Sequence, residues 1–279
     1  TVLATKFLAE NLLKQKKGVV YCANRLLRFK LEHIIINDYG LDPNSISFRI
    51  FSDLITTDSI SNDIDFLVFD ESQEYFDKGL FDLIDQLMVK LEDPKVLVLY
   101  DPEQSIVSNF KELAWYTDFF IDSGYTHYYF DEIYRCIQNK RIAEISNCIL
   151  LNAYHKITKD FTDIVHNVDT LANKLRILKQ IFDETRFTKS EKIILVQSHL
   201  LDDFKEIVND YYSGDIEELT ESNINIPPTK HRYTTSLKFR GLEAESVYLV
   251  TTELNDVTRV QNYVGATRAM NSLNIILWK

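Results

Sequence analysis

Two acidic residues, Asp70 and Glu71, stand directly after the apolar run Phe66–Phe69. A continuous apolar run bounded by helical patterns is typical of a strand covered on both faces, as in a parallel sheet. Ligands of such sheets bind at the carboxyl ends of the strands. Because the two acidic side chains point in different directions, one can hold the shell of a Mg²⁺ ion while the other polarises a water molecule. The alternative is a solvated strand end, where acidic residues are common.

A second apolar run, Val96–Tyr100, also stops at polar residues, namely Asp101, Gln104 and Ser105. A glutamine in this place can hydrogen-bond both a phosphate oxygen and a nucleic-acid group. A plain Asp-Pro turn explains the same residues without any ligand. Taken alone, this segment leaves both interpretations open.

The elements that would position these residues alternate between strand and helix along the chain. We expect strands at Val19–Cys22, Ser45–Phe51, Phe66–Phe69, Val96–Tyr100, Thr126–Phe130, Ile193–Val196, Val247–Val250 and Leu273–Trp278. We expect helices over 1–18, Leu80–Leu91, Gln138–Asn152, Val168–Phe182, Leu201–Tyr211 and Tyr263–Met270. The polar segment 214–230, with two adjacent prolines, is expected to be a loop. Two series of β/α units predict an α/β fold with mainly parallel sheets, divided into lobes at 1–124 and 125–279.

The charge of the chain is acidic: 31 basic and 42 acidic side chains among 279 residues give a net charge of −11. A hydrophobic fraction of 45% provides enough apolar side chains for the cores of two ordinary domains. The acidic balance argues against a protein that coats nucleic acid through bulk charge, but it leaves room for a local basic groove.

Three cysteines, Cys22, Cys136 and Cys148, form no C-x-x-C pair and no metal-binding pattern with histidine. This argues against a zinc site or a disulfide framework and favours reduced thiols. The sequence shows neither a signal peptide nor an apolar run approaching the ~18 residues of a membrane span. We therefore expect a cytoplasmic protein without a membrane partner.

Together and in this order, the segments resemble the motifs of superfamily 1 helicases of the UvrD/Rep type. The closest likeness is to the compact helicase domains found with nuclease-related modules. DESQ at 70–73 resembles motif II, usually Asp-Glu-Ala-Gln-Asp, with Ser72 in place of alanine and Glu74 in place of the final acid. DPEQSI at 101–106 resembles motif III, and EIYRC at 132–136 resembles motif IV.

The later part of the chain carries two further motifs. TSLKFRGLEAESVYLV at 235–250 resembles motif V, with Leu237 in place of histidine and Arg240 in place of the second lysine. YVGATRA at 263–269 resembles motif VI and is nearly unaltered. Five motifs in the family's order cover nearly the whole chain, which makes the set far more specific than any one motif.

The resemblance implies two RecA-like P-loop NTPase lobes that use ATP and Mg²⁺. Asp70 would hold Mg²⁺ through water, Glu71 would be the base that activates the attacking water, and Gln104 would sense the γ-phosphate. Thr1 would be a direct Mg²⁺ ligand, as the hydroxyl residue of a Walker A loop. The glycines and the lysine of that loop are not in this sequence, so we expect the fragment as given to bind ATP poorly.

The same resemblance assigns nucleotide contacts to motifs IV, V and VI. Tyr134 would stack on adenine, and Gly241 and Glu243 would contact the phosphates and the ribose. Arg135 and Arg268 would be arginine fingers that stabilise the charge developing in the transition state. The plain alternatives are surface salt bridges for the arginines and core packing for the tyrosine.

Nucleic-acid contacts are assigned to residues near motifs Ia, III and V. Phe110 could stack on a base of a single strand, a contact worth ~1–3 kcal/mol, or it could belong to the core. Asn24 and Arg25, where motif Ia would lie, could grip phosphates, although Arg25 suits a solvated helix equally well. Lys238 and Arg240 could also contact the strand, an idea that the lost histidine of motif V weakens.

The spacing of the motifs limits what the chain could do. Only about 100 residues separate Arg135 from Thr235, which leaves no room for the large inserted subdomain of bigger relatives. We therefore expect a minimal ATP-dependent motor acting on single-stranded or partly duplex DNA, with RNA left open and a fused or separate nuclease as partner. The alternative is a nucleotide-binding regulatory or scaffold module of a multi-domain nuclease or defence system, without unwinding activity.

Overall fold

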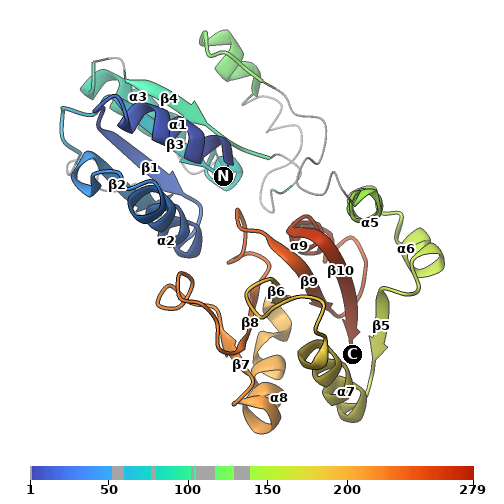
Figure 1. Ribbon diagram of the computed structural model, residues 1–279. Coiled ribbons are helices and arrows are strands. Elements are labelled where there is room, and N and C mark those ends of the chain that lie inside the picture. Colours follow the sequence, from blue (N-terminus) through green and yellow to red (C-terminus); the bar gives the residue numbers. More distant parts are fainter. Residues whose placement is uncertain are drawn as a thin grey trace. The chain divides into compact units, whose positions relative to one another are not determined.

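The computed structural model describes residues 2–51, 60–76, 80–92, 94–101, 104, 117–128 and 139–279. The chain forms two units, Thr1–Tyr129 and Phe130–Lys279, and each has its own sheet (Figure 1). The boundary predicted from the sequence lies slightly earlier, between residues 124 and 125. No helix within the described ranges is long and apolar enough to cross a bilayer.

The first unit is built on a four-stranded parallel sheet in the order β2-β1-β3-β4. Its strands are β1 (Gly18–Cys22), β2 (Ile46–Ile50), β3 (Phe66–Asp70) and β4 (Lys95–Val98). In register, Cys22 lies opposite Asp70, and Phe69 lies opposite Val98. The carboxyl ends of β1, β3 and β4 therefore lie next to one another along one edge of the sheet.

Helices cover both faces of this sheet (Figure 1). They are α1 (Val2–Leu12), α2 (Arg25–His33), which continues as a π-helical turn over Ile34–Asp38, and α3 (Leu80–Lys90), with 3₁₀ turns at Pro43–Ser45 and Ser72–Glu74. Phe7 of α1 packs edge-on against Phe66, with ring centroids 5.8 Å apart. The next strand residue, Leu67, joins the buried cluster of Leu83 and Leu87 from α3. Because successive strand residues point to opposite faces, α1 and α3 cover opposite faces.

Gly18 begins β1 at a point where the ring of Phe66 fills the neighbouring space. A Cβ atom on Gly18 would lie 2.0 Å from Cε2 of Phe66. Phe66 is itself completely buried, so it could not move aside without disturbing the core. The absence of a side chain at Gly18 therefore allows β1 and β3 to pair at this end.

The second unit is built on a six-stranded sheet in the order β5-β10-β9-β6-β8-β7, in which every neighbouring pair is parallel. Its strands are β5 (Val165–Val168), β6 (Lys192–Val196), β7 (Ile216–Glu218), β8 (His231–Thr235), β9 (Ala244–Thr251) and β10 (Ala269–Trp278). Its helices are α5 (Lys140–Leu150), α6 (Tyr154–Asp160), α7 (Leu171–Asp183), α8 (Leu201–Tyr212) and α9 (Arg259–Ala266), with a 3₁₀ turn at Ser198–Leu200.

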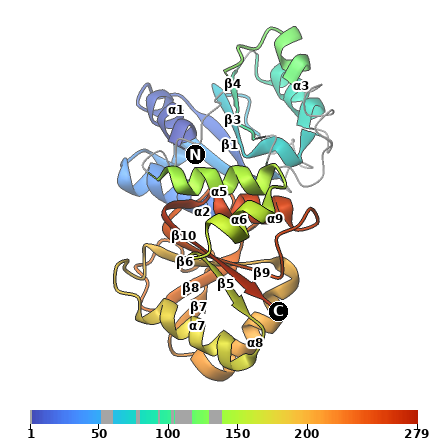
Figure 2. The ribbon, with the colours of Figure 1, turned by 90° about the vertical axis from the view of Figure 1, so that its right-hand side faces the viewer.

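Helices also cover both faces of the second sheet. α7 and α8 share one buried cluster with Tyr248 and Val250 of β9. Leu249, which lies between Tyr248 and Val250 on β9, faces Gly265 of α9. A Cβ added to Gly265 would lie 2.7 Å from the leucine side chain. α9 therefore lies on the opposite face from α7 and α8, and α5 lies beside α9 (Figures 1 and 2).

Two edge strands were not expected from the sequence. β5 precedes the helix that was expected to begin at Val168, and α7 instead begins at Leu171, after the cap residue Thr170. The hydroxyl of Thr170 accepts a hydrogen bond from the backbone N–H of Asn173 at 3.3 Å. β7 lies inside 214–230, which was expected to be a loop. Both strands are short and partly polar, because an edge strand has one neighbour and needs no continuous apolar run.

Three further differences concern β8, the helix before β10 and the strand expected near residue 126. β8 was not expected, because it opens with the polar residues His231 and Arg232, which the structure buries. The helix expected over Tyr263–Met270 ends at Ala266, and the residues after Arg268 belong to β10. The strand expected at Thr126–Phe130 is not formed in its described part, which has no regular structure up to residue 128.

Candidate functional site

Asp70 is the last residue of β3, and its side chain lies inside the first unit with 2% exposure. Burial raises the pKa of this carboxyl group, and the neighbouring charge of Glu71 raises it further. A cation placed at Asp70 would favour the charged form and reverse this shift. The described residues contain no group of three or more His, Cys, Asp or Glu side chains that could hold a metal. A single carboxylate that acts together with phosphate oxygens and water still fits what Mg²⁺ prefers.

Glu71 turns the chain sharply at the end of β3. Its backbone is left-handed, with φ 57° and ψ 46°, a conformation that is uncommon for residues other than glycine and costs about 1 kcal/mol or more. The turn leads into the 3₁₀ turn Ser72–Glu74. The side chain is half-buried, and its Oε2 accepts a hydrogen bond from Nε2 of Gln73 at 3.1 Å. The carboxylate is therefore held by its own turn.

Gln73 joins the ends of β3 and β4. Its side chain is completely buried, and its Oε1 accepts a hydrogen bond from the backbone N–H of Asp101 at 3.2 Å. Nε2 of Gln104 in turn donates to Oδ2 of Asp101 at 2.6 Å. Glu71, Gln73, Asp101 and Gln104 thus form one hydrogen-bonded chain, which we call the glutamine relay. The sequence assigned no role to Gln73, although it is the glutamine of the DESQ motif.

Two further contacts tie this edge together. Both the backbone N–H and the hydroxyl of Ser72 donate to the carbonyl oxygen of Leu99, each at 3.0 Å. The hydroxyl of Tyr75 donates to the carbonyl oxygen of Ala23 at 3.2 Å. The turns that follow β1, β3 and β4 are therefore connected directly, as an ordered ligand site requires.

Asn24 and Arg25 follow β1 at the same edge. Oδ1 of Asn24 accepts a hydrogen bond from the backbone N–H of Leu27 at 2.9 Å, so this side chain caps the start of α2. An asparagine at this position satisfies one of the free donors of the first helical turn. Arg25 is exposed on the first turn of α2. The structure therefore gives Asn24 a structural role, and Arg25 is the more exposed of the two residues.

The motif V segment of the second unit runs from the end of β8 to the start of β9. β8 and β9 are parallel and lie on either side of β6, so the eight residues 236–243 must run from the carboxyl end of β8 back to the amino end of β9. Phe239, Arg240 and Leu242 are buried along this path, whereas Lys238 is exposed near its beginning. Gly241, with φ 82°, adopts a conformation that other residues rarely use. The burial of Arg240 makes it unsuited to gripping a strand from the surface.

Arg268 and Glu243 lie at the amino ends of β10 and β9. The backbone N–H of Ala244 donates to the carbonyl oxygen of Arg268 at 3.0 Å, so the two strand starts are adjacent. The guanidinium of Arg268 is completely buried, where Nε donates to the carbonyl oxygen of Val264 at 3.1 Å and Nη2 donates to the hydroxyl of Thr267 at 3.0 Å. The structure thus brings motifs V and VI together at this edge.

Four of the residues assigned from the sequence lie outside the described part of the chain. They are Thr1, Phe110, Tyr134 and Arg135. Their assigned roles stay predictions from the resemblance.

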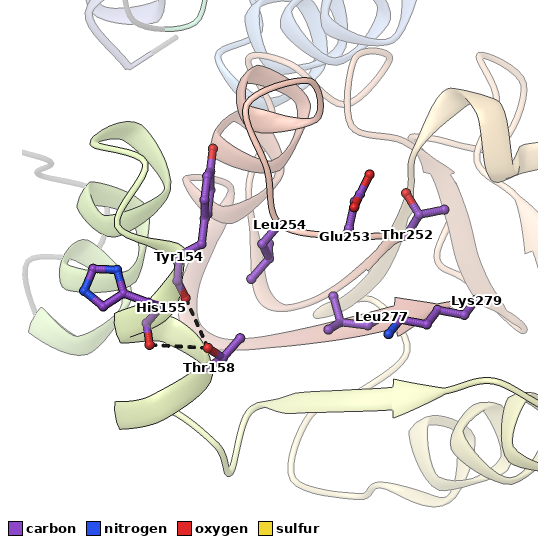
Figure 3. A pocket seen from close by; sticks show the side chains of 8 residues that line it. All are labelled: Tyr154, His155, Thr158, Thr252, Glu253, Leu254, Leu277 and Lys279. Atoms are coloured by element: carbon purple, nitrogen blue, oxygen red, sulfur yellow. Dashed lines mark hydrogen bonds between the residues drawn. The ribbon is translucent and has the colours of Figure 1, made fainter.

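A pocket of about 440 Å³ lies at the carboxyl ends of β9 and β10, beside α6 (Figure 3). It is lined by Tyr154, His155, Thr158, Thr252, Glu253, Leu254, Leu277 and Lys279. The hydroxyl of Tyr154 donates to the carbonyl oxygen of Asn255 at 2.9 Å, which fixes one wall. No residue assigned from the sequence lines this pocket.

Comparisons with known proteins support the fold through structure and not through sequence. No family model and no curated protein matches the sequence. Among solved structures, Saccharomyces cerevisiae Dbp5 bound to RNA and ADP BeF3 aligns with 99% of this chain and 76% of its own, at 11% identity and a TM-score of 0.61. A Pif1 helicase structure at forked double-stranded DNA aligns with 97% of this chain and 84% of its own, at 13% identity and a TM-score of 0.48.

A third solved structure is the C-terminal domain of a possible DNA helicase from Lactobacillus plantarum. It covers 41% of this chain and 71% of its own, at 16% identity and a TM-score of 0.32. The likeness to Dbp5 confirms the expected architecture: two RecA-like lobes, each with a parallel sheet covered by helices. At such low identity the comparison establishes the fold alone.

Proposed function

We propose that this chain is the ATP-hydrolysing core of a nucleic-acid motor of superfamily 1, of the UvrD/Rep type, acting on single-stranded DNA. The observation that supports it most is the glutamine relay, which connects the acidic end of β3 with the polar end of β4. A solvated strand end would need no buried glutamine between two acidic residues. A motor needs a connection of this kind between motifs II and III to couple ATP hydrolysis to movement along the nucleic acid.

Asp70 and Glu71 are proposed to have different roles at the end of β3. Asp70 would hold Mg²⁺ through water, and the ion, when bound with ATP, would neutralise charge on the phosphates. Glu71 would take a proton from the attacking water as it approaches the γ-phosphate. The hydrogen bond from Gln73 holds the Glu71 carboxylate in one orientation, which a general base requires.

The second unit would supply charge stabilisation and the remaining nucleotide contacts. Arg268, Gly241 and Glu243 are proposed to face the phosphates and the ribose, together with Tyr134 and Arg135 from motif IV. The adjacent starts of β9 and β10 support this grouping for Glu243 and Arg268. Since Arg268 is held by Val264 of α9 and by Thr267, it would have to release these hydrogen bonds to reach a phosphate.

The test is ATP hydrolysis by the full-length protein, with and without single-stranded DNA. We expect DNA-stimulated turnover, and we expect Glu71→Gln to lower it by about 10²–10⁴-fold, the usual contribution of a general base. Glu92→Gln is a matched control, because Glu92 lies in the same unit, has φ 52° and is exposed. Equal turnover of the Glu71 variant and the wild type would show that Glu71 is not the general base.

The same experiment separates the motor from the regulatory alternative. Nucleotide binding without any turnover would favour a switch or scaffold, for which the nucleotide state is read by a partner protein. A nuclease partner, fused or separate, stays a prediction from the resemblance. Stimulation of turnover by RNA and not by DNA would change the proposed substrate to RNA and would leave the proposed motor activity in place.

A further inference from the structure

Two lysines from different elements of the second unit converge on a single carboxylate. Nζ of Lys205, on α8, lies 2.7 Å from Oε2 of Glu218, the last residue of β7. Nζ of Lys238, in the motif V segment, lies 3.1 Å from Oε1 of the same residue. Each carboxylate oxygen therefore has its own ammonium group. Two oxygens of one phosphate group could be held in the same way.

The cluster lies at the carboxyl edge of the second sheet. Glu218 is opposite Tyr233 in register, two residues before β8 ends at Thr235, and Lys238 follows shortly after. Lys205 lies in the second turn of α8, which begins soon after β6 ends at the same edge. Edges formed by the carboxyl ends of parallel strands are where α/β sheets bind ligands.

The neighbouring charges have other partners or lie at the margin of the cluster. Glu217 accepts a hydrogen bond from Nε of Arg232 at 3.1 Å, so it does not compete for the two lysines. Asp202 interacts with Lys205 through its charge, but the ion pair with Glu218 is the contact that Lys205 makes at 2.7 Å. Glu218 is less exposed than either lysine. Both lysines remain open to a ligand that approaches from solvent.

We propose that Lys205 and Lys238 form a binding site for one backbone phosphate of a nucleic acid, and that Glu218 occupies this site when no nucleic acid is bound. Glu218 is thus an internal competitor that stands in for the phosphate. The proposal rests on the proposed function, because it presumes that the chain binds nucleic acid. It adds Lys205 and Glu218, to which the sequence assigned no role.

The test is the binding of a fluorescently labelled oligodeoxythymidylate to the full-length protein without nucleotide, measured by anisotropy over a range of salt concentrations. Lys205→Ala and Lys238→Ala should each weaken binding about threefold to fivefold, the size expected of an exposed ion pair. Each should also reduce the slope of log affinity against log salt by about 0.7, the value for one phosphate of a single strand. Glu218→Gln should strengthen binding by a similar factor, because it removes the competitor.

Lys230→Ala is the matched control. Lys230 stands at the opposite end of β8 from Lys238, and its Nζ donates to the carbonyl oxygen of Ser213 at 2.8 Å. Its removal should leave affinity and salt slope unchanged. Thermal unfolding of every variant distinguishes a lost contact from a lost fold.

Four results would overturn the proposal. One is weaker or unchanged binding by folded Glu218→Gln, another is an equal loss in Lys230→Ala and Lys205→Ala, and the third is no binding by either wild type or Glu218→Gln. Competition by inorganic phosphate that abolishes all difference between the variants would indicate a free-phosphate site and would also count against it. Turnover of ATP without DNA is measured separately, so failure of this site leaves the test of the motor unaffected.

Discussion

The carboxyl edges of the two sheets hold their polar side chains in different ways. In the first unit, the glutamine relay links Glu71 to Gln104 through hydrogen bonds of two buried glutamine side chains, Gln73 and Gln104. In the second unit, Glu218 is held by ion pairs with two partly exposed lysines. Buried hydrogen bonds fix geometry, whereas exposed ion pairs exchange readily with those of a ligand. The first edge is therefore suited to chemistry, and the second to reversible binding of charge.

The second unit also differs in how its motifs are distributed. Motif II and motif III lie at the same edge of the first sheet, because each follows the carboxyl end of a strand. Motif V instead starts with Thr235 at the carboxyl end of β8 and continues through 236–243 into β9, so it includes residues at both ends of the parallel strands. Lys238 and Glu243 are only five residues apart, but Lys238 follows the carboxyl end of β8 and Glu243 precedes the amino end of β9.

The largest effect in this comparison is expected from the glycines that allow each unit to pack. Gly18→Ala would place a Cβ 2.0 Å from Phe66, and Gly265→Ala would place one 2.7 Å from Leu249. We expect losses of stability of about 3 and about 2 kcal/mol, respectively, from overpacking. Gly214→Ala, which has nothing within 4 Å, should change stability by less than about 0.5 kcal/mol.

Urea unfolding combined with hydrogen exchange would locate these losses. Faster exchange confined to β3 and its neighbours is expected for Gly18→Ala, and faster exchange around β9 for Gly265→Ala. Loosening of both units by either change would show that the two sheets do not fold as separate cooperative units.

The second unit should also be sensitive to acid through His231. Burial, and then the charges of Lys192 and Lys189, lower the pKa of this histidine from its usual 6.5 to about 4. Between these values the unfolded chain binds more protons than the folded one, so stability should be full above pH 6.5 and fall as pH drops toward 4. The total loss is of the order of 1–3 kcal/mol. Urea unfolding at pH 7 and pH 5 measures it.

His231→Phe is the variant that isolates this effect. It keeps an aromatic ring stacked on Phe182, which lies 4.8 Å from the imidazole centroid, but it cannot take up a proton. The difference in stability between pH 7 and pH 5 should shrink in the variant. An unchanged difference would assign the acid sensitivity to other groups.

The smallest expected effect tests the glutamine relay. Gln73→Ala removes the bridge between Glu71 and Asp101, and we expect DNA-stimulated turnover to fall about tenfold, with basal turnover falling less. Gln86→Ala, on the exposed side of α3, is the control. If both rates fell by the same factor, Gln73 would support the base alone and would not connect motif II with motif III.

Local patterns were sufficient to predict most strands and the acidic strand ends. Phe66–Phe69 is apolar without interruption because β3 is buried on both faces, so its position and the placement of Asp70 and Glu71 could be predicted. The short edge strands β5 and β7 carry no such pattern. β8 was missed although it is internal, because its buried His231 and Arg232 look like surface residues in the sequence.

The sequence by itself determined the α/β class, the two lobes and the residues that end β3 and β4, since these follow from apolar runs and from motifs that are contiguous in the chain. Only the tertiary structure decided that Gln73 bridges to Asp101, that Asn24 caps α2, and that Lys205 and Lys238 share Glu218. Most of these contacts join residues that are distant in the chain, so the strand order of each sheet sets them and no local pattern records them. The cap on α2 is local, but the sequence alone allowed Asn24 to grip a phosphate instead.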